Sequence, residues 1–419
     1  MSDFPTMLSV AAARTHVVDF CAQRKPAREV VPLYAAVGRI LCDDVIAAAD
    51  LPPFANSAMD GFALHGVALP AADERRFRII GTRLAGNAGG LSPGVGECVR
   101  ITTGAPMPAG ADTVVIREHV VEEAGSIIVR AGERRGAHVR PAGEDFRAGE
   151  CVMRRGQRIR ATRIGALAAM GLAQVAVFAR PRVGILTTGD ELVLPGAPCG
   201  PAQIHNSNGF SIAAMLDADG CVPAVGSGAG ANLPFRHLPD DRALIRSALL
   251  AAAAEFDVII TSGGVSAGEA DHLPGLIAEL GRIHFWKVRM RPGMPILFGE
   301  IGKAMVFCLP GNPVSTIATF LCLVRPALAT LQAAEEIDPP LRHARLTTAI
   351  DKRHDRTEFL RAACTAGEDG TLWVTPMQGQ GSAMLRGMID ANALIVVAED
   401  CRRIEAGEPV QILLLPGVS

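Results

Sequence analysis

The sequence predicts a multidomain fold: a central, parallel, doubly wound α/β domain, a β-rich domain inserted near the N-terminus, and a small C-terminal β-barrel or sandwich. Three observations support this prediction. Strand, loop and helix patterns alternate through residues 182–330, Pro and Gly punctuate short β-like runs in 49–140, and β-like runs return after Pro339-Pro340. Repeated strand–loop–helix units are typical of a parallel sheet, and closely spaced short strands are typical of a barrel or sandwich.

The N-terminal region is expected to be helical through residue 48, because apolar residues are interleaved with polar ones there. A second helix is expected over 162–170, where it could pack with the first segment and leave the β-rich block inserted between them. The predicted domains are therefore a linker or dimerisation domain of 1–48 with 141–180, an inserted β-rich domain over 49–140, an α/β domain over 181–330, and a C-terminal β domain over 338–419.

The individual elements follow from local patterns. In the inserted block, β-like runs lie at 78–80, 98–101, 113–116 and 127–130. In the α/β region, strands are expected at 182–186, 258–260 and 304–309, and helices at 209–218 (with Asn206-Ser207-Asn208 as a cap), 244–256, 272–280 and 313–324. The last helix is expected to stop at Arg325-Pro326. The C-terminal strands are expected at 345–350, 357–363, 372–375, 394–397 and 410–415.

Composition narrows the class of protein. The chain has 419 residues, a net charge of −2, and ten cysteines without a C-x-x-C pair. The charge argues against a non-specific nucleic-acid binder, and the scattered cysteines argue against a zinc site or a redox pair. The N-terminus shows no apolar signal segment, and the longest apolar helix is too short to span a bilayer. We therefore expect a cytoplasmic protein that binds neither nucleic acid nor membrane.

A glycine-rich loop between a strand and a helix is the most informative motif. It runs from Thr261 to Asp271 and contains Ser262, Gly263, Gly264 and Ser266. Such a loop can cradle phosphate with its backbone N–H groups and the following helix N-terminus. Its acids, Glu269 and Asp271, would repel phosphate unless a divalent cation lay between them. The loop therefore predicts a phosphate ester bridged by magnesium.

Two further loops follow strands of the same region, and ligands in such sheets bind beyond the carboxyl ends of the strands. In the first, Thr187 would bind phosphate, and Asp190 or Glu191 would face the site. The alternative is a turn with a solvated acid pair. The second loop, a turn shaped by proline or a phosphate contact, contains Gly311, Asn312 and Ser315.

Three cations alternate over Phe285–Pro295, namely Lys287, Arg289 and Arg291. On a strand they would share one face and could bind phosphates or an oxyanion. A solvated strand face is the alternative. Asn56–Gly61 and Thr102–Pro106, taken alone, are more typical of structural turns.

Together these motifs resemble the molybdopterin molybdenumtransferase family (MoeA), the bacterial relative of the gephyrin E domain. The matching segments occur in the family's order and are Asn56–Gly61, Ile101–Ala105, Gly143–Asp145, Thr188–Leu192, Ser262–Asp271, Phe285–Lys287 and Leu309–Ser315. The resemblance implies an elongated homodimer of four-domain chains. It also implies a reaction in which adenylylated molybdopterin and molybdate give molybdenum cofactor and AMP, with Mg²⁺.

The resemblance also implies which residues act. It assigns catalytic roles to Asp60, Thr103 and Asp145 of the N-terminal half, and to Glu191, Asp240, Asp271, Lys287 and Arg291. Glu191, Asp240 and Asp271 would hold the metal, with Asp241 as an alternative to Asp240. In the dimer, the β-rich block of one chain would cover the α/β site of the other. The adenylyltransferase and acceptor molybdoenzymes would be partner proteins.

The chain departs from the family in its oxyanion pocket, to which Arg361 and Ser382 would contribute. Where the family commonly has Lys-Pro-Gly-Lys-Pro, this chain has Arg291-Pro292-Gly293-Met294-Pro295. Arg291 keeps the charge without lysine's compact geometry. Met294 has no charge with which to hold molybdate.

Three alternatives remain at this point. One is the preceding adenylyl transfer, whose enzyme shares the α/β domain, although the N-terminal motifs argue against it. Another is a non-catalytic scaffold of the gephyrin type, although the retained acids and Lys287 argue against it. The third is the insertion of tungsten in place of molybdenum.

Overall fold

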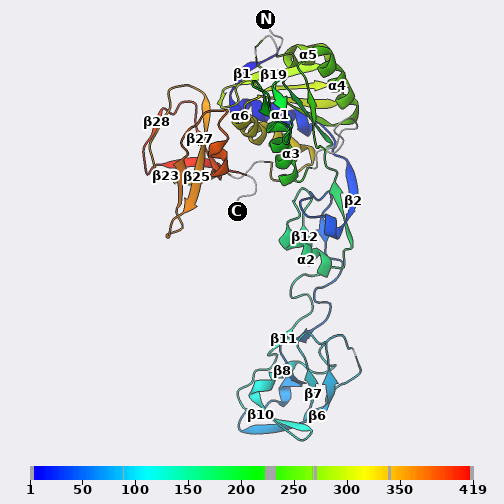
Figure 1. Ribbon diagram of the computed structural model, residues 1–419. Coiled ribbons are helices and arrows are strands. Elements are labelled where there is room, and N and C mark those ends of the chain that lie inside the picture. Colours follow the sequence, from blue (N-terminus) through cyan, green and yellow to red (C-terminus); the bar gives the residue numbers. More distant parts are fainter. Residues whose placement is uncertain are drawn as a thin grey trace.

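The computed structural model describes residues 4–87, 89–221, 233–266, 268, 271–337 and 341–415. These residues form an elongated molecule with an α/β domain at one end, a C-terminal β domain beside it, and a β-rich domain at the far end of a slender arm (Figure 1).

The α/β domain is built on a seven-stranded sheet of order β1-β19-β21-β22-β18-β14-β17. Its central strands β14, β18 and β22 are parallel, which confirms the predicted doubly wound sheet. Strand β21 runs antiparallel to both of its neighbours, so the sheet as a whole is mixed. The strands are β1 (Thr6–Leu8), β14 (Val183–Thr188), β17 (Arg236–Leu238), β18 (Val258–Ser262), β19 (Arg282–Val288), β21 (Leu297–Ile301) and β22 (Ala304–Leu309).

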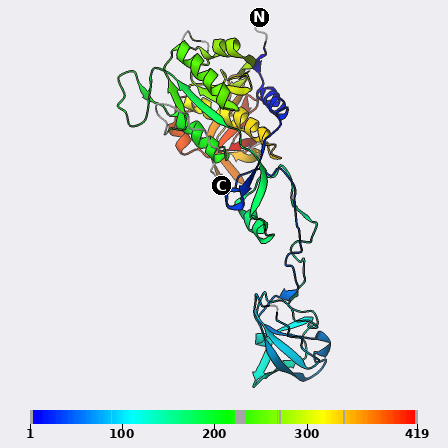
Figure 2. The same ribbon diagram turned by 90° about the vertical axis from the view of Figure 1, so that its right-hand side faces the viewer.

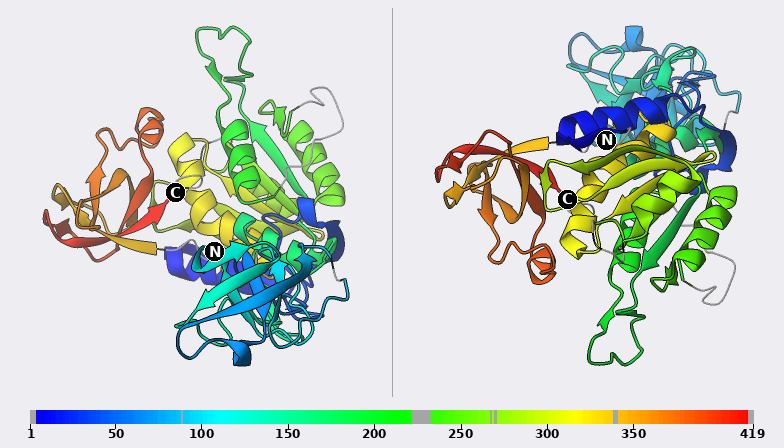
Figure 3. Two further views of the ribbon diagram at one scale, coloured as in Figure 1. Left: turned by 90° about the horizontal axis from the view of Figure 1, so that it is seen from below. Right: turned by 90° about the horizontal axis from the view of Figure 1, so that it is seen from above.

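Helices cover both faces of this sheet (Figure 3). Because side chains alternate along a strand, Ile260 of β18 packs into the core on one face while Ile259 packs into the core on the other. The first face is covered by α1 (Val10–Ala22), α3 (Asn208–Ala218) and the helical run Pro313–Leu331, and the second by α4 (Arg242–Glu255) and α5 (Leu273–Leu280).

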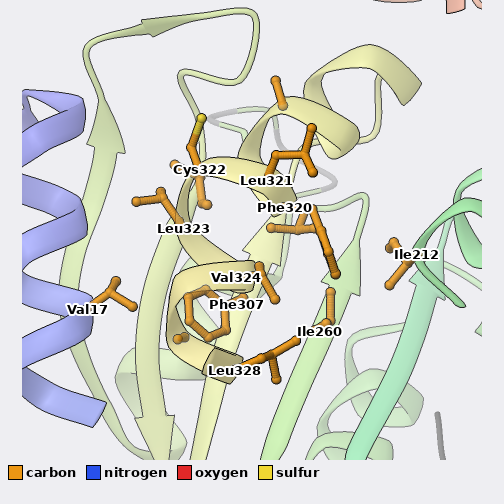
Figure 4. Close-up of a cluster of buried hydrophobic side chains, with 14 of the residues drawn as sticks. Val17, Ile212, Ile260, Phe307, Phe320, Leu321, Cys322, Leu323, Val324 and Leu328 are labelled. Atoms are coloured by element: carbon orange, nitrogen blue, oxygen red, sulfur yellow. The ribbon is translucent and has the colours of Figure 1, made fainter. Parts of the chain in front are cut away.

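The run Pro313–Leu331 lies at the centre of the first core, where Phe320 and Leu328 pack with Val17, Ile212 and Ile260 (Figure 4). The predicted stop at Arg325-Pro326 is wrong. The run consists of α6 (Pro313–Thr319), a π-helical turn (Phe320–Val324) and α7 (Arg325–Leu331). Pro326 is tolerated because it sits in the first turn of α7. By length and composition the run could cross a membrane, but 83% of its apolar window is buried inside the protein.

The arm corrects the prediction that residues 1–48 are helical. Within the described residues 4–48, α1 is the only α-helix. The chain then leaves the α/β domain as β2 (Arg28–Pro32), which pairs with the returning strand β13 (Gln174–Phe178). This pairing joins segments more than a hundred residues apart, so no local pattern predicts it. The other arm elements are η1 (Leu33–Ala35), β3 (Val45–Ile46), β12 (Cys151–Met153) and α2 (Ala161–Ala169). The chain between the two halves of the arm forms the β-rich distal domain, which lies at the end of the arm (Figure 2).

The distal domain contains a six-stranded sheet of order β8-β5-β7-β6-β10-β9, with Phe62, Phe77 and Ile127 buried in its core. All four predicted β-like runs lie in its strands. Its elements are β4 (Asn56–Ser57), β5 (Gly61–Leu64), η2 (Gly66–Ala68), β6 (Glu74–Arg83), β7 (Glu97–Ile101), β8 (Thr113–Ile116), η3 (Arg117–His119), β9 (Val120–Glu123), β10 (Ser126–Arg130) and β11 (Val139–Arg140).

The C-terminal strands form a closed barrel, which is one of the two predicted forms, because the sheet order β25-β26-β23-β29-β27 is completed by a pairing of β25 with β27. A short strand before it in the chain, β20 (Met290–Arg291), also pairs with β25 and so ties the α/β domain to the barrel. The elements are β23 (Leu341–Leu346), β24 (Ile350–Asp351), β25 (Thr357–Ala366), β26 (Leu372–Pro376), α8 (Arg386–Ile389), β27 (Ala393–Val397), β28 (Arg403–Ile404) and β29 (Pro409–Leu414).

Candidate active site

A cavity of about 290 Å³ opens at the carboxyl ends of β14, β18 and β22. The three loops that the sequence singled out meet there. The lining residues are Thr188, Gly189, Glu191, Asp240, Gly263, Gly264, Val265, Ser266, Asp271, Pro295, Pro310, Gly311 and Asn312. A larger cavity, about 660 Å³, lies between α1, the π-helical turn and the barrel, but its lining is mainly apolar and holds none of the predicted site residues. We therefore place the candidate site at the smaller cavity.

Glycine is required where the glycine-rich loop approaches the end of β14. Gly263 and Gly264 have φ angles of +99° and +64°. A Cβ atom on Gly263 would lie 2.5 Å from the carbonyl oxygen of Thr188. No other residue allows this backbone conformation and approach at low cost. The two glycines therefore bring the loop against β14, so that its backbone borders the cavity.

Two asparagines hold the loops together, although the sequence pattern assigns them only to a helix cap. Asn208 Nδ2 donates to Ser262 Oγ (2.8 Å) and to the carbonyl oxygen of Gly311 (2.7 Å). Asn206 Nδ2 donates to Thr187 Oγ1 (2.8 Å). The sequence did offer one signal for these asparagines, which is their position after β14. They directly follow two short paired strands, β15 (Leu192–Val193) and β16 (Ile204–His205).

Three predicted phosphate-binding residues do not line the cavity. Thr187, Ser262 and Ser315 are buried. The hydroxyls of Thr187 and Ser262 already accept hydrogen bonds from the two asparagines. Because neighbouring residues on a strand point to opposite sides, Thr188 rather than Thr187 reaches the cavity.

The structure separates the two candidate acids before α4. Asp240 lines the cavity and exchanges hydrogen bonds with Asp190: each carboxylate accepts from the other residue's backbone N–H, at 3.0 and 3.3 Å. Asp241 instead caps α4 by accepting from the N–H of Leu244 at 2.8 Å. Asp271 also lines the cavity, and its Oδ2 accepts from the N–H of Gly268 at 2.8 Å. Glu269 lies outside the described residues.

Glu191, Asp240 and Asp271 thus face the same cavity. Within the described part of the chain, no three His, Cys, Asp or Glu side chains are close enough together to form a metal site by themselves. The carboxylate oxygens are nevertheless the hard ligands that Mg²⁺ prefers.

The expectation that three cations share one strand face is wrong. β19 ends at Val288, and Lys287 has a φ of +65°, so the regular alternation is broken. Lys287 Nζ lies 4.7 Å from the ring centre of Trp286. Arg289 pairs with Asp355 and Glu399, and Arg291 Nε lies 3.5 Å from Glu358 Oε1. These acids come from the C-terminal domain, which the local pattern could not reveal.

Arg361 and Ser382 contact neighbouring residues rather than the cavity itself. Arg361 is fully buried, and its guanidinium donates to the carbonyl oxygens of Gly379, Gly381 and Met384. Burial lowers the pKa of Arg361. This network shapes the loop that carries Ser382, whose Oγ accepts from Asn312 Nδ2 at 3.0 Å. Neither residue lines the cavity. The structure does not support direct contact of Arg361 with an oxyanion, because its guanidinium is fully buried and donates to backbone carbonyl oxygens.

The N-terminal site residues lie far from this cavity in the same chain. Asp60 and Thr103 adjoin β5 and β7 of the distal domain, at the end of the arm (Figure 1). Asp145 is exposed and lies between β11 and β12, where its N–H donates to the carbonyl oxygen of Leu51. Asp60 Oδ1 accepts from the N–H of Thr103 (2.7 Å) and from its hydroxyl (2.8 Å). These two hydrogen bonds lower the pKa of Asp60.

Replacing Thr103 by alanine should raise the pKa of Asp60 toward its usual value, since the hydroxyl bond is lost and only the backbone N–H bond remains. A lowered folded-state pKa adds stability above the unfolded-state pKa, and that stability is lost as the pH falls through the folded-state value. The free energy of unfolding of the variant should therefore fall less on acidification than that of the wild type. Carboxyl ¹³C NMR titration of Asp60 measures the shift, with Thr103→Ser as the control; equal pKa values in both variants would contradict the assignment.

The fold and the cavity define the class of protein: a multidomain α/β protein with a cavity at the carboxyl ends of its parallel strands, which is where sheets of this kind bind ligands. Family models match the chain over residues 8–171 (MoeA N-terminal region, domains I and II), 184–330 (probable molybdopterin binding domain) and 343–415 (MoeA C-terminal region, domain IV). The chain belongs to the MoeA family, which confirms the resemblance seen in its motifs.

Relatives match over nearly the whole chain. The molybdopterin molybdenumtransferase of Haemophilus influenzae is 34% identical over 92% of this chain and 93% of its own length. Molybdopterin molybdenumtransferase 2 of Mycobacterium tuberculosis is 34% identical, with 91% and 94% covered. A crystal structure of the molybdopterin biosynthesis MoeA protein from Pyrococcus horikoshii superposes with a TM-score of 0.82, at 27% identity, over 98% of this chain and 100% of that one. The adenylyltransferase and scaffold alternatives are therefore not favoured.

Proposed function

We propose that this chain inserts molybdenum from molybdate into adenylylated molybdopterin and releases AMP. The observation that carries the proposal is the cavity at the strand ends. There, the backbone of the glycine-rich loop and three carboxylates face one volume of about 290 Å³, in a chain of the MoeA family. Carboxylates repel phosphate unless a cation lies between them. The pyrophosphate that links AMP to molybdopterin in the proposed substrate would be the phosphate bound there.

Different residues of the chain would bind the substrate and hold the loops of the cavity in place. The backbone of Gly263, Gly264 and Gly311 would bind and orient the phosphates. Ser266 and Asn312 line the same volume and offer hydrogen bonds to the ligand. Ser262, Thr187 and Ser315 would keep these loops in place from beneath.

The carboxylates of Glu191, Asp240 and Asp271 would hold Mg²⁺. Since no complete metal site is found among the described residues, they fit an ion held jointly with substrate phosphate, which is the usual arrangement for Mg²⁺. The bound ion would polarise the phosphoryl oxygens. Lys287 and Arg291, at the joint with the C-terminal domain, would stabilise negative charge on phosphate or molybdate.

We further propose that the working form is a homodimer in which the distal domain of one chain covers the α/β cavity of the other. The support is geometric: the distal domain, whose strands β5 and β7 adjoin Asp60 and Thr103, stands at the far end of an arm from its own chain's α/β domain (Figure 2). Asp60 is exposed, and two hydrogen bonds from Thr103 hold its carboxylate in place, so it is accessible to a ligand of a partner chain.

We also propose that the protein works in the cytoplasm, with an adenylyltransferase supplying its substrate and molybdoenzymes accepting its product. All ten cysteines are free thiols, as is usual for proteins of a reducing compartment.

The test is AMP release from adenylylated molybdopterin by the purified protein with Mg²⁺, with and without molybdate. Release that depends on molybdate is the expected result. A folded, dimeric protein that releases no AMP would contradict the proposal. A parallel series with tungstate determines which oxyanion is preferred.

A further inference from the structure

An arginine from the C-terminal domain lies beside the cavity and was not found by sequence reasoning. Arg356 Nη1 is 3.7 Å from Sδ of Met294. Met294 directly precedes Pro295, which lines the cavity. Strand β20, which begins this turn, pairs with β25, which begins one residue after Arg356. The pairing therefore holds Arg356 beside the turn that leads to Pro295, although Arg356 itself does not line the cavity.

The charge of Arg356 is not neutralised within the part of the chain that the structure describes. Among the described residues, its guanidinium forms no ion pair, and its one hydrogen-bond partner is the Met294 thioether, while the residue is partly buried. The neighbouring Arg289, by contrast, pairs with Asp355 and Glu399.

Glu358, which pairs with Arg291 across β20 and β25, does not neutralise the charge of Arg356. Glu358 Oε1 lies 3.5 Å from Arg291 Nε and 3.3 Å from His354 Nε2. Lys352 is buried and donates to backbone carbonyl oxygens, one of which belongs to Arg356. Among the described residues, one carboxylate thus faces Arg291 and none pairs with Arg356, which leaves excess positive charge at the rim.

The guanidinium of Arg356 also lies near the place where a lysine at position 294, in place of Met294, would put its charge. Sδ of methionine is as many bonds from the backbone as Cδ of lysine, and a lysine ammonium would lie two bonds further on. A group 3.7 Å from Sδ is therefore within the region that such an ammonium would occupy.

We infer that Arg356 binds the substrate oxyanion and supplies the positive charge that Met294 lacks. The inference rests on the proposed function and adds a residue to it. A guanidinium suits a tetrahedral dianion because it donates two parallel hydrogen bonds to adjacent oxygens. With Arg291, it makes an oxyanion site in which one cation comes from the α/β domain and the other from the barrel.

The test compares Arg356→Gln with Arg353→Gln, which removes the same charge from an exposed neighbour. Two quantities are measured: the molybdate concentration that half-saturates AMP release, and molybdate binding in equilibrium dialysis without the second substrate. Loss of one charge-assisted hydrogen bond should weaken binding roughly tenfold to a hundredfold in Arg356→Gln. Arg353→Gln should behave as the wild type does.

A double variant separates oxyanion binding from a structural role. Adding Met294→Lys to Arg356→Gln should restore molybdate binding, since the ammonium would return to the same place. A loss that Met294→Lys does not restore, or an equal effect of both arginine variants, would overturn the inference.

The test also separates this inference from the proposed function. Molybdate-dependent AMP release with no effect of Arg356→Gln leaves the function standing and removes the role of Arg356. If the wild type releases no AMP but binds molybdate in dialysis, the function fails and the dialysis comparison still decides the role of Arg356. If the wild type does neither, both fail.

Discussion

Replacing Asp271 by asparagine should lower the rate of AMP release by about a hundredfold or more while the protein stays folded. The carboxylate lines the cavity at the end of the glycine-rich loop. If it holds a cation against substrate phosphate, removing its charge takes away electrostatic stabilisation made at the reacting group, and single groups of this kind are worth roughly 10²–10³ in rate.

Asparagine is the appropriate replacement because of one hydrogen bond. Asp271 Oδ2 accepts from the N–H of Gly268 at 2.8 Å, and an amide oxygen can accept the same bond. The loop should therefore keep its shape, and the variant should differ from the wild type mainly in charge.

A matched control is Asp217→Asn. Asp217 is an exposed acid on α3, outside the cavity lining. The rate of AMP release and the thermal midpoint of unfolding are measured for both variants. If Asp271→Asn works at the wild-type rate, the role assigned to this carboxylate is wrong. If its midpoint falls while that of Asp217→Asn does not, the loss of rate has a structural cause.

The elements of the α/β domain could be predicted from the sequence because their signals are local. A strand such as β22 is a short apolar run, and its predicted bounds are those in the structure, Ala304–Leu309. The arm could not be predicted in this way, since β2 forms only by pairing with β13. Local helical spacing in the first segment was therefore misleading after Ala22.

The same distinction applies to the site. The three loops could be predicted because each follows a parallel strand, and parallel strands place their carboxyl ends at one edge. The sequence could not show which hydroxyl of each loop reaches the cavity, so it favoured Thr187 where Thr188 lines the cavity. Arg356 carries no motif, and it lies beside Met294 only because β25 of the barrel pairs with β20.

The dimer proposal makes a prediction that no single variant can test. We expect a heterodimer of one Asp60→Asn chain and one Asp271→Asn chain to have about half the wild-type activity, although each homodimeric variant is inactive. In a two-fold symmetric dimer both sites are equivalent. If each site combines a distal domain with the partner's cavity, the heterodimer holds one site with both changes and one with neither.

The measurement requires two affinity tags, so that only heterodimers are isolated from cells that make both chains. Their AMP release is then compared with that of wild-type dimers purified in the same way. In the Asp60→Asn chain, the amide oxygen can still accept a hydrogen bond from Thr103, as the carboxylate of Asp60 does, so the distal domain should remain folded.

The alternative arrangement gives the opposite result. If each cavity were completed by its own distal domain, every site of the heterodimer would carry one change, and no activity would return. The arm argues against that arrangement on geometry, since it holds the distal domain at the far end of the molecule from the cavity (Figure 1). An inactive heterodimer would therefore contradict the proposal that the distal domain of one chain covers the cavity of the other.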